Sequence, residues 1–165
     1  MNASIACAGD GATRLLKLSG ELRHDNAGAL EDLIEQWFDH GDGAVNEVII
    51  DLNDLTFMDS TVIGLLAAIT RGLAEIDAGK PLVFSSGSEI NALLRSLRLD
   101  EAMNLIDQPA QTPAISLSDC QDGESHEQVS GPSILRAHEL LMGMSEENRE
   151  AFEPVVELLR ANLRH

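Results

Sequence analysis

Residues 47–66 read EVIIDLNDLTFMDSTVIGLL, and this stretch decides the fold. It opens with EVIIDL, from Glu47 to Leu52, a continuous run rich in β-branched residues that is typical of a strand covered on both faces. It closes in an apolar run with helical spacing. A hydroxyl pair, Ser60 and Thr61, stands between the two runs. We therefore expect a central strand, a turn at TFMDS, and a helix that begins near the hydroxyls.

The hydroxyl pair has two interpretations. In the first, Ser60 only caps the helix, which is worth about 1 kcal/mol. In the second, the Ser60 hydroxyl is a site of covalent modification, with Thr61 as an alternative acceptor of the modifying group. Asp59 is another candidate for the cap, and a cap at Asp59 would leave the Ser60 hydroxyl exposed. The flanking sequence is needed to choose between them.

Strand-like and helix-like patterns alternate on both sides of this stretch. A turn at GDGAT separates the first two strands, and helices that follow strands favour crossover connections in a mixed sheet. The sequence predicts an α/β fold with a mixed β-sheet packed against helices, in the order β-β-α-β-α-β-α-β. The elements are expected at Ser4–Ala8, Leu15–Ser19, Asn26–His40, Glu47–Leu52, 62–76, 81–86, Ser88–Leu97 and Met103–Ile106.

The chain changes character after this alternating region. Pro, Gln, Ser, Asp and Glu dominate residues 108–131 without periodicity, which indicates a flexible linker. Residues 132–165 then form a helical extension, with helices expected at Ile134–Met142 and Glu146–Leu163. The second helix follows a serine cap in SEEN, and Pro154 suggests a kink or a later start.

Two helices of this size cannot form much of a core alone. We therefore expect the extension to pack on the main domain, on a second copy in a homodimer, or on a partner.

Composition excludes several classes of partner. The formal net charge of −17 repels phosphate backbones and anionic lipid, so we expect no direct contact with nucleic acid or membrane, and a partner with a basic face. No run is apolar over the roughly 18 to 20 residues that span a bilayer, and the N-terminus lacks a signal-peptide pattern, so we expect a cytoplasmic protein. Cys7 and Cys120 are far apart and lack metal-ligand spacing, so neither a disulfide nor a zinc site is expected.

The residues that could carry out enzyme chemistry do not match a known catalytic motif. Asp51, Asp54 and Asp59 cluster around one strand end and suggest a magnesium site, but the acidic pair and lysine of a receiver domain are missing. No histidine is paired with a serine or cysteine in a nucleophile motif. His138 on an amphipathic helix is a candidate phosphotransfer residue, although a surface residue is favoured. We expect no catalytic residue, no metal and no cofactor, and hence not an enzyme.

Four segments together resemble a known family. LSGEL at 18–22, VIIDLNDLTFMDST at 48–61, Gly64, and INALLRSLRL at 90–99 resemble the STAS fold of bacterial anti-sigma factor antagonists. The resemblance spans about residues 3–107, so residues 1–107 are expected to form a STAS domain. It does not cover the extension.

The resemblance implies a function. In that family, the serine after the aspartate of the turn is phosphorylated by a kinase that is often also the anti-sigma factor, and a separate serine phosphatase removes the phosphate. Ser60 falls on that position. The unphosphorylated form binds the anti-sigma factor and the phosphorylated form releases it. The alternative is a constitutive STAS-type scaffold or transport-complex subunit in which Ser60 is never modified.

The docking surface implied by the resemblance consists of the Ser60 turn, its helix face and the loop at 23–26. Arg23 could lie close enough to pair with the phosphate, because arginine makes strong charge-assisted contacts. The partner-binding residues are expected to be Arg23, His24, Asp25, Asn26, Asp59, Thr61, Ile63 and Gly64.

Overall fold

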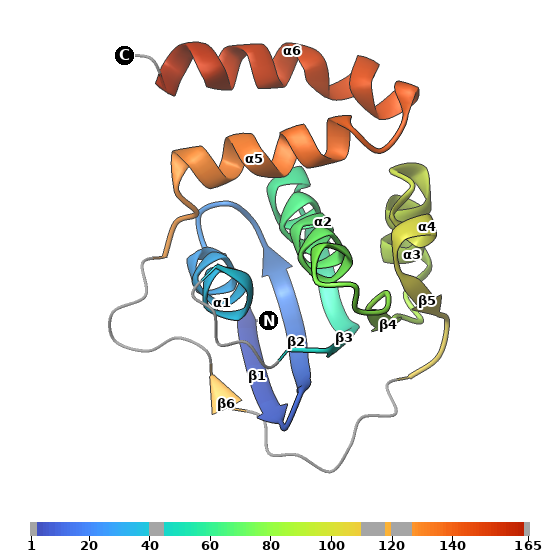
Figure 1. Cartoon of the computed structure of the whole chain (residues 1–165). Coiled ribbons are helices and arrows are strands. Elements are labelled where there is room, and N and C mark those ends of the chain that lie inside the picture. Colours follow the sequence, from blue (N-terminus) through green and yellow to red (C-terminus); the bar gives the residue numbers. More distant parts are fainter. Residues whose placement is uncertain (1–2, 40–44, 110–117, 120–126, 164–165) are drawn as a thin grey trace.

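The structure is a computed structural model that describes residues 3–39, 45–109, 118–119 and 127–163. Figure 1 labels its elements. The strands are β1 (Ser4–Asp10), β2 (Thr13–Leu22), β3 (Glu47–Met58), β4 (Leu82–Phe84), β5 (Asn104–Ile106) and β6 (Ser118–Asp119). The helices are α1 (Gly28–Phe38), α2 (Ser60–Glu75), α3 (Ser88–Ser96), α4 (Leu99–Ala102), α5 (Gly131–Met142) and α6 (Glu146–Leu163).

The strands form one mixed sheet in the order β5-β4-β3-β2-β1-β6. β2, β3, β4 and β5 run parallel, whereas β1 is antiparallel to both β2 and β6. The β1–β2 hairpin turns at Gly11, whose φ of 61° suits the tight connection between Asp10 and Thr13. The predicted α/β class and mixed sheet are confirmed.

The central strand is longer than the sequence predicts. Residues 48 to 52 are buried, as expected for a strand covered on both faces, but β3 continues to Met58. The turn expected at TFMDS is therefore wrong over its first three residues. The reason is β2, which extends to Leu22 and pairs its last residue with Met58 through two register shifts. Only Asp59 separates the strand from α2.

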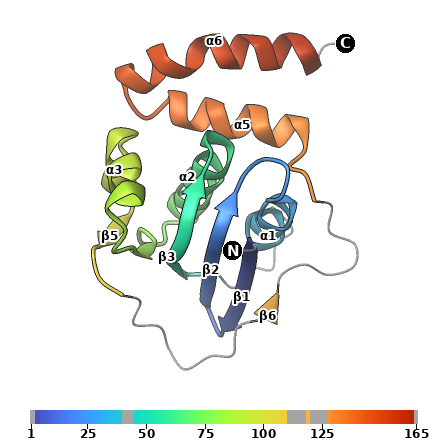
Figure 2. The same ribbon diagram turned by 180° about the vertical axis from the view of Figure 1, so that it is seen from behind.

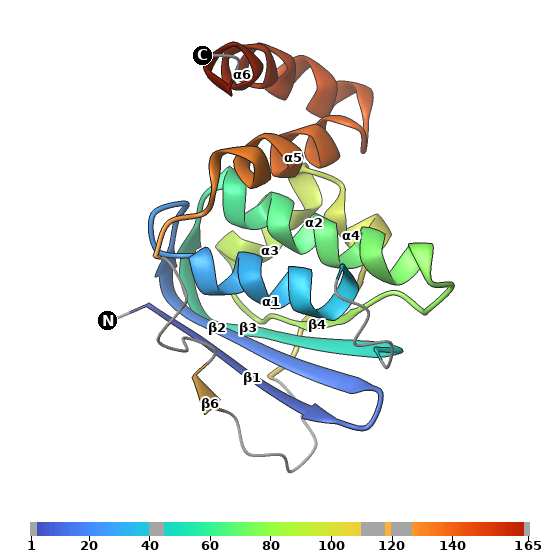
Figure 3. The ribbon, with the colours of Figure 1, turned by 60° about the vertical axis from the view of Figure 1, so that its left-hand side comes forward.

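Helices cover one face of the sheet in successive layers. α1 and α2 lie on the sheet, α5 lies on α2, and α6 is outermost (Figure 3). The main core gathers between the sheet and α1, α2 and α3 and includes Leu16, Ile50 and Leu66. Alternate strand residues on the opposite face, Leu15 and Ile49 with Phe84, form a smaller buried cluster.

The extension folds back onto the main domain, which is one of the three expected arrangements. α5 and α6 form a hairpin that crosses the end of α2 in both views of Figures 1 and 2. The serine cap of α6 is confirmed, since Ser145 Oγ accepts a hydrogen bond from Asn148 N at 3.0 Å. Pro154 lies inside α6, so the later start does not occur. No described helix is long and apolar enough to cross a bilayer.

Three sequence expectations fail. The pattern predicts neither the short helix α4 nor β6, which lies within the range predicted as a linker. Ser88 precedes the apolar residues of its helix, and the sequence therefore predicts it as the cap; in the structure Gly87 takes that position and Ser88 is the first helical residue of α3. Cys7 is disulfide-bonded, contrary to the expected reduced state. The pairing of Cys7 with Ser118 places a distant segment beside β1, so separation along the chain is no guide to proximity there.

Candidate functional site

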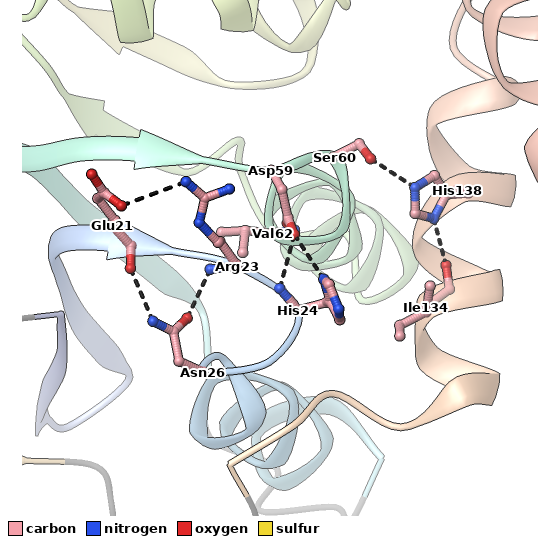
Figure 4. Close-up of polar contacts among 9 residues, drawn as sticks. All are labelled: Glu21, Arg23, His24, Asn26, Asp59, Ser60, Val62, Ile134 and His138. Atoms are coloured by element: carbon pink, nitrogen blue, oxygen red, sulfur yellow. Dashed lines mark hydrogen bonds and ion pairs between the residues drawn. The ribbon is translucent and has the colours of Figure 1, made fainter.

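Asp59 organises the turn between β3 and α2. It is the N-cap of α2, and its Oδ1 accepts a hydrogen bond from Val62 N at 3.0 Å. Its Oδ2 accepts from His24 N at 2.9 Å and lies 3.2 Å from His24 Nδ1. One carboxylate thus caps the helix and holds the neighbouring loop (Figure 4). Because Asp59 is the cap, the cap-only interpretation of Ser60 is wrong.

The loop at 23–26 is closed by its own last residue. Asn26 Oδ1 accepts from Arg23 N at 2.7 Å, and Asn26 Nδ2 donates to Glu21 O at 3.0 Å. Arg23, His24 and Asp25 are exposed, while Asn26 is half-buried. The loop and the α2 turn, both predicted from the sequence as parts of one docking surface, do lie side by side.

Arg23 extends along the strands and is not directed at Ser60. Its guanidinium lies 3.5 Å from Glu21 Oε2 and 4.1 Å from the centre of the Phe57 ring. The guanidinium covers one face of the Phe57 ring, which remains 38% exposed. The sequence-based idea that Arg23 pairs with a phosphate on Ser60 would require this side chain to leave both partners.

Ser60 is the first residue of α2 and is half-buried. Its Oγ lies 2.8 Å from Nε2 of His138 on α5, and His138 Nδ1 lies 2.8 Å from Ile134 O (Figure 4). A carbonyl oxygen can only accept, so Nδ1 carries the proton, and in a neutral imidazole Nε2 then accepts from the Ser60 hydroxyl. His138 is only 4% exposed and packs edge-on to Phe152, so the surface position favoured from sequence is wrong.

The remaining predicted docking residues are covered. Thr61 and Ile63 are 4% and 2% exposed, and Gly64 is buried. A Cβ at Gly64 would lie 2.5 Å from both Cβ and O of Ala137, so α5 touches the α2 backbone there. The structure therefore brings Asp59 and the loop together at the surface, and places Thr61, Ile63 and Gly64 out of reach of solvent.

His138 is the residue that sequence reasoning misplaced. The signal was available, because Ile134, Ala137, His138 and Leu141 recur at three- and four-residue steps and so share one helix face. Ala137, His138 and Leu141 are indeed the buried residues of α5. A histidine in an apolar stripe requires a polar partner, which Ser60 supplies.

The expected acidic cluster is split. Asp51 and Asp54 face Lys17, whose Nζ lies 2.9 Å from Asp54 Oδ2 and 4.0 Å from Asp51 Oδ2. The hydrogen bond that Lys17 donates to Asp54 raises the pKa of Lys17 above its usual value against an opposing effect of burial, and the negative charges of both carboxylates add to the rise. Asp59 serves α2 instead. Within the described residues, no group of three or more His, Cys, Asp or Glu side chains is arranged to hold a metal.

The fold is found in solved structures, among them two with TM-scores above 0.5. One is Bacillus SpoIIAA in the phosphorylated form, with a TM-score of 0.52 and 21% identity, covering 62% of this chain and 91% of that chain. The other is an anti-sigma factor antagonist from Mycobacterium paratuberculosis, with a TM-score of 0.51 and 21% identity, covering 67% and 88%. At this identity the likeness establishes the fold alone.

Sequence comparisons add the family. A search of curated protein sequences finds no match to the chain. The family model described as "Mlab, STAS domain" matches residues 5–107, which include the sheet from β1 to β5, the Asp59 turn and α2, and exclude α5 and α6. The chain therefore belongs to the STAS domain family.

Proposed function

We propose that the protein is an anti-sigma factor antagonist that acts by partner switching in the cytoplasm. It binds an anti-sigma factor while Ser60 is unphosphorylated and releases it once a serine kinase has modified Ser60. A serine phosphatase reverses the change. The protein itself is not an enzyme in this proposal, and it needs no cofactor.

The observation that carries the proposal is the position of the Ser60 hydroxyl. It sits on the first residue of α2, directly after the cap Asp59 and beside the exposed loop at 23–26. A phosphate adds about −1.5 to −2 charges and three acceptor oxygens. Backbone N–H groups at the start of α2 and the positive end of the helix dipole can stabilise that phosphate locally. Asp59 beside Ser60 is already negative, so phosphorylation makes the docking surface more negative without requiring a change in the fold.

Family membership and the two structural neighbours support this assignment. One of those neighbours carries a phosphate, and the other is described as an anti-sigma factor antagonist. The net charge of −17 supports a partner with a basic face, since further negative charge would oppose an acidic one.

A second candidate is a constitutive scaffold or transport-complex subunit in which Ser60 is never modified. The hydrogen bond between Ser60 Oγ and the buried His138 favours it, because a hydroxyl held inside the protein has a structural role already. The intact mass of the protein purified from its own cells separates the two candidates. A population heavier by one phosphate, lost in Ser60→Ala, supports partner switching.

Partner capture from native lysate tests the switch. Wild type and Ser60→Ala are expected to retain an anti-sigma factor that Ser60→Asp loses, with at least about a tenfold drop in affinity, or about 1.4 kcal/mol. Ser88→Asp is the matched control, because Ser88 is also the first residue of a helix and is exposed. Equal capture by Ser60→Asp and Ser60→Ala would contradict the proposal.

A further inference from the structure

We propose that the α5–α6 hairpin is a built-in cover for the Ser60 docking surface, which must lift before a kinase or an anti-sigma factor can reach it. The inference rests on the proposed function for the identity of the binding partners. The structural part, that α5 closes position 60 and that position 60 opens when α5 moves, does not depend on which partner binds.

The cover touches each part of the docking surface. His138 takes the Ser60 hydroxyl, and Ala137 lies against Gly64 on the α2 face. The segment just before α5 reaches the loop as well, because Val129 N donates to His24 O at 2.7 Å. One continuous stretch, 129–138, therefore occupies the turn, the helix face and the loop.

The start of α5 is anchored by a buried carboxylate. Glu31 on α1 is only 4% exposed. It accepts a hydrogen bond from Ser130 N at 3.0 Å and one from Ser130 Oγ. Gly28 N also donates to Glu127 O at 2.8 Å. These contacts fix the point from which α5 departs, so a motion of the hairpin would pivot near Ser130, uncovering the turn and the α2 face while Val129 stays on the loop.

The rest of α5 packs on α2 between two hollows. A hollow of about 380 Å³ lies between α2 and the far end of α5, lined in part by Thr70, Leu140 and Met144. A second hollow of about 160 Å³ lies between α1, α2 and α5. The contact between the hollows includes the close approach of Ala137 to Gly64 and the buried side chain of Leu141.

α6 adds little hold on the STAS domain. Its buried residues are Asn148 and Val156, and Leu158 is 68% exposed. Asn148 Nδ2 donates to Leu97 O at 2.8 Å, a single hydrogen bond near the hairpin turn. Lifting the hairpin therefore breaks the α2 contact, the Ser60–His138 bond and this one link, and it exposes Leu141 of the main core, while the pairing of the strands is left in place.

Phosphorylation needs this opening for a chemical reason. The transfer forms a bond between Ser60 Oγ and the γ-phosphorus of the nucleoside triphosphate held by the kinase. It breaks the bond from that phosphorus to the leaving diphosphate, and the hydroxyl proton passes to a base of the kinase. In the closed form that proton is directed at His138 Nε2, and α5 lies beside the oxygen that must attack.

Thiol labelling of the full chain tests the cover without any kinase. Ser60→Cys places a thiol under α5, and Ser88→Cys places one at the exposed start of α3, so both share the effect of a helix N-terminus. The probe is a bulky maleimide that carries polyethylene glycol. Its labelling rate at each thiol is divided by the rate of the small reagent iodoacetamide at the same thiol, so that differences in thiolate reactivity cancel. The parent protein supplies the background rate. We expect a ratio at least about tenfold lower at position 60 than at position 88.

Opening α5 should remove that difference. Gly64→Ala forces a Cβ to 2.5 Å from Ala137, and Ala137→Leu makes the same collision from α5. Either change should raise labelling at position 60 at least about fivefold. Gly72→Ala is the control, because the same substitution in the same helix meets the Phe38 ring of α1 and not α5. Circular dichroism checks that each variant is folded.

The outcomes separate this inference from the proposed function. Equal labelling ratios at positions 60 and 88, or no acceleration in either wedge variant that folds, would overturn the cover. If position 60 labels slowly, labels faster in Gly64→Ala, and the protein never carries phosphate in cells, the cover is retained and partner switching is rejected. If the protein carries phosphate on Ser60 but position 60 labels as fast as position 88, partner switching is retained and the cover is rejected.

Discussion

At the scale of single residues, the nearby carboxylates of Asp54 and Asp59 make different kinds of contact. Asp59 caps α2 and holds His24, so its charge is committed to backbone N–H groups. Asp54 is 56% exposed at its side chain and instead meets the Lys17 ammonium. The sequence places both in one acidic cluster, but the strand between them directs their side chains to different neighbours.

The Lys17 ion pair predicts a pH dependence at alkaline pH. Its pKa is raised above 10.5 in the folded protein, so the charged form stabilises the fold fully below the unfolded pKa, and this stabilisation is lost as pH rises through the folded pKa. Lys17→Met should lower the free energy of unfolding by less than about 1 kcal/mol near neutral pH, since the pair is partly exposed. The deficit should shrink above pH 10.5.

Urea denaturation of both proteins at pH 7 and pH 11 measures this change. The background is simple, because Lys80 is the other lysine of the chain and there is no tyrosine. Lys80→Met is the control at an exposed lysine. A Lys17→Met deficit that grows with pH would mean that the ammonium does not stabilise the folded state.

At the scale of elements, the contact between α1 and the start of α5 holds the extension to the domain. Glu31→Gln removes the charge of the carboxylate that accepts from both Ser130 N and Ser130 Oγ. Because hydrogen bonds to a charged group are replaced by weaker neutral ones, the free energy of unfolding should fall by about 1–3 kcal/mol. Glu35→Gln is the matched control, one turn away on the same helix and exposed.

Chemical denaturation and hydrogen exchange check this prediction together. Both substitutions remove one negative charge, so their difference isolates the hydrogen bonds. Exchange should rise at residues 131–142 in Glu31→Gln and stay at the wild-type rate in Glu35→Gln. Equal stability of the two variants would show that Glu31 does not anchor α5.

Elements with a strong period were predictable, and contacts between them were not. The β-branched run at 48–50 and the helical stripes give β3, α2 and α5 from local pattern alone. The far end of β3 depends on pairing with β2 across register shifts, and β6 depends on pairing with β1. The Ser60–His138 bond joins residues 78 apart, and a one-dimensional period carries no information about such a pair.

At the scale of the whole molecule, the fold is a stack of four layers. The sheet carries α1 and α2, α5 rests on these, and α6 is farthest from the core (Figure 3). The family match ends before the outer two layers, at residue 107. Val155 and Leu158 of α6 remain exposed, so contact with a second copy through these helices stays a prediction. The layers outside the family domain are thus the ones that cover its candidate site.

The charge of the whole molecule predicts how salt affects its stability. The chain carries 28 acidic and 11 basic residues, so the compact state repels itself. Raising NaCl shortens the Debye length from about 30 Å at 0.01 M to about 10 Å at 0.1 M, which screens this repulsion across the surface. Exposed ion pairs such as Arg71–Glu75 are screened too, but each is worth only about 0–1 kcal/mol.

Repulsion should therefore dominate, and the thermal midpoint should rise with NaCl. A series from 0.01 to about 0.3 M NaCl, followed by circular dichroism, measures the slope, and sucrose at equal osmolality controls for solute exclusion. A midpoint that falls with salt would show that the ion pairs outweigh the net charge.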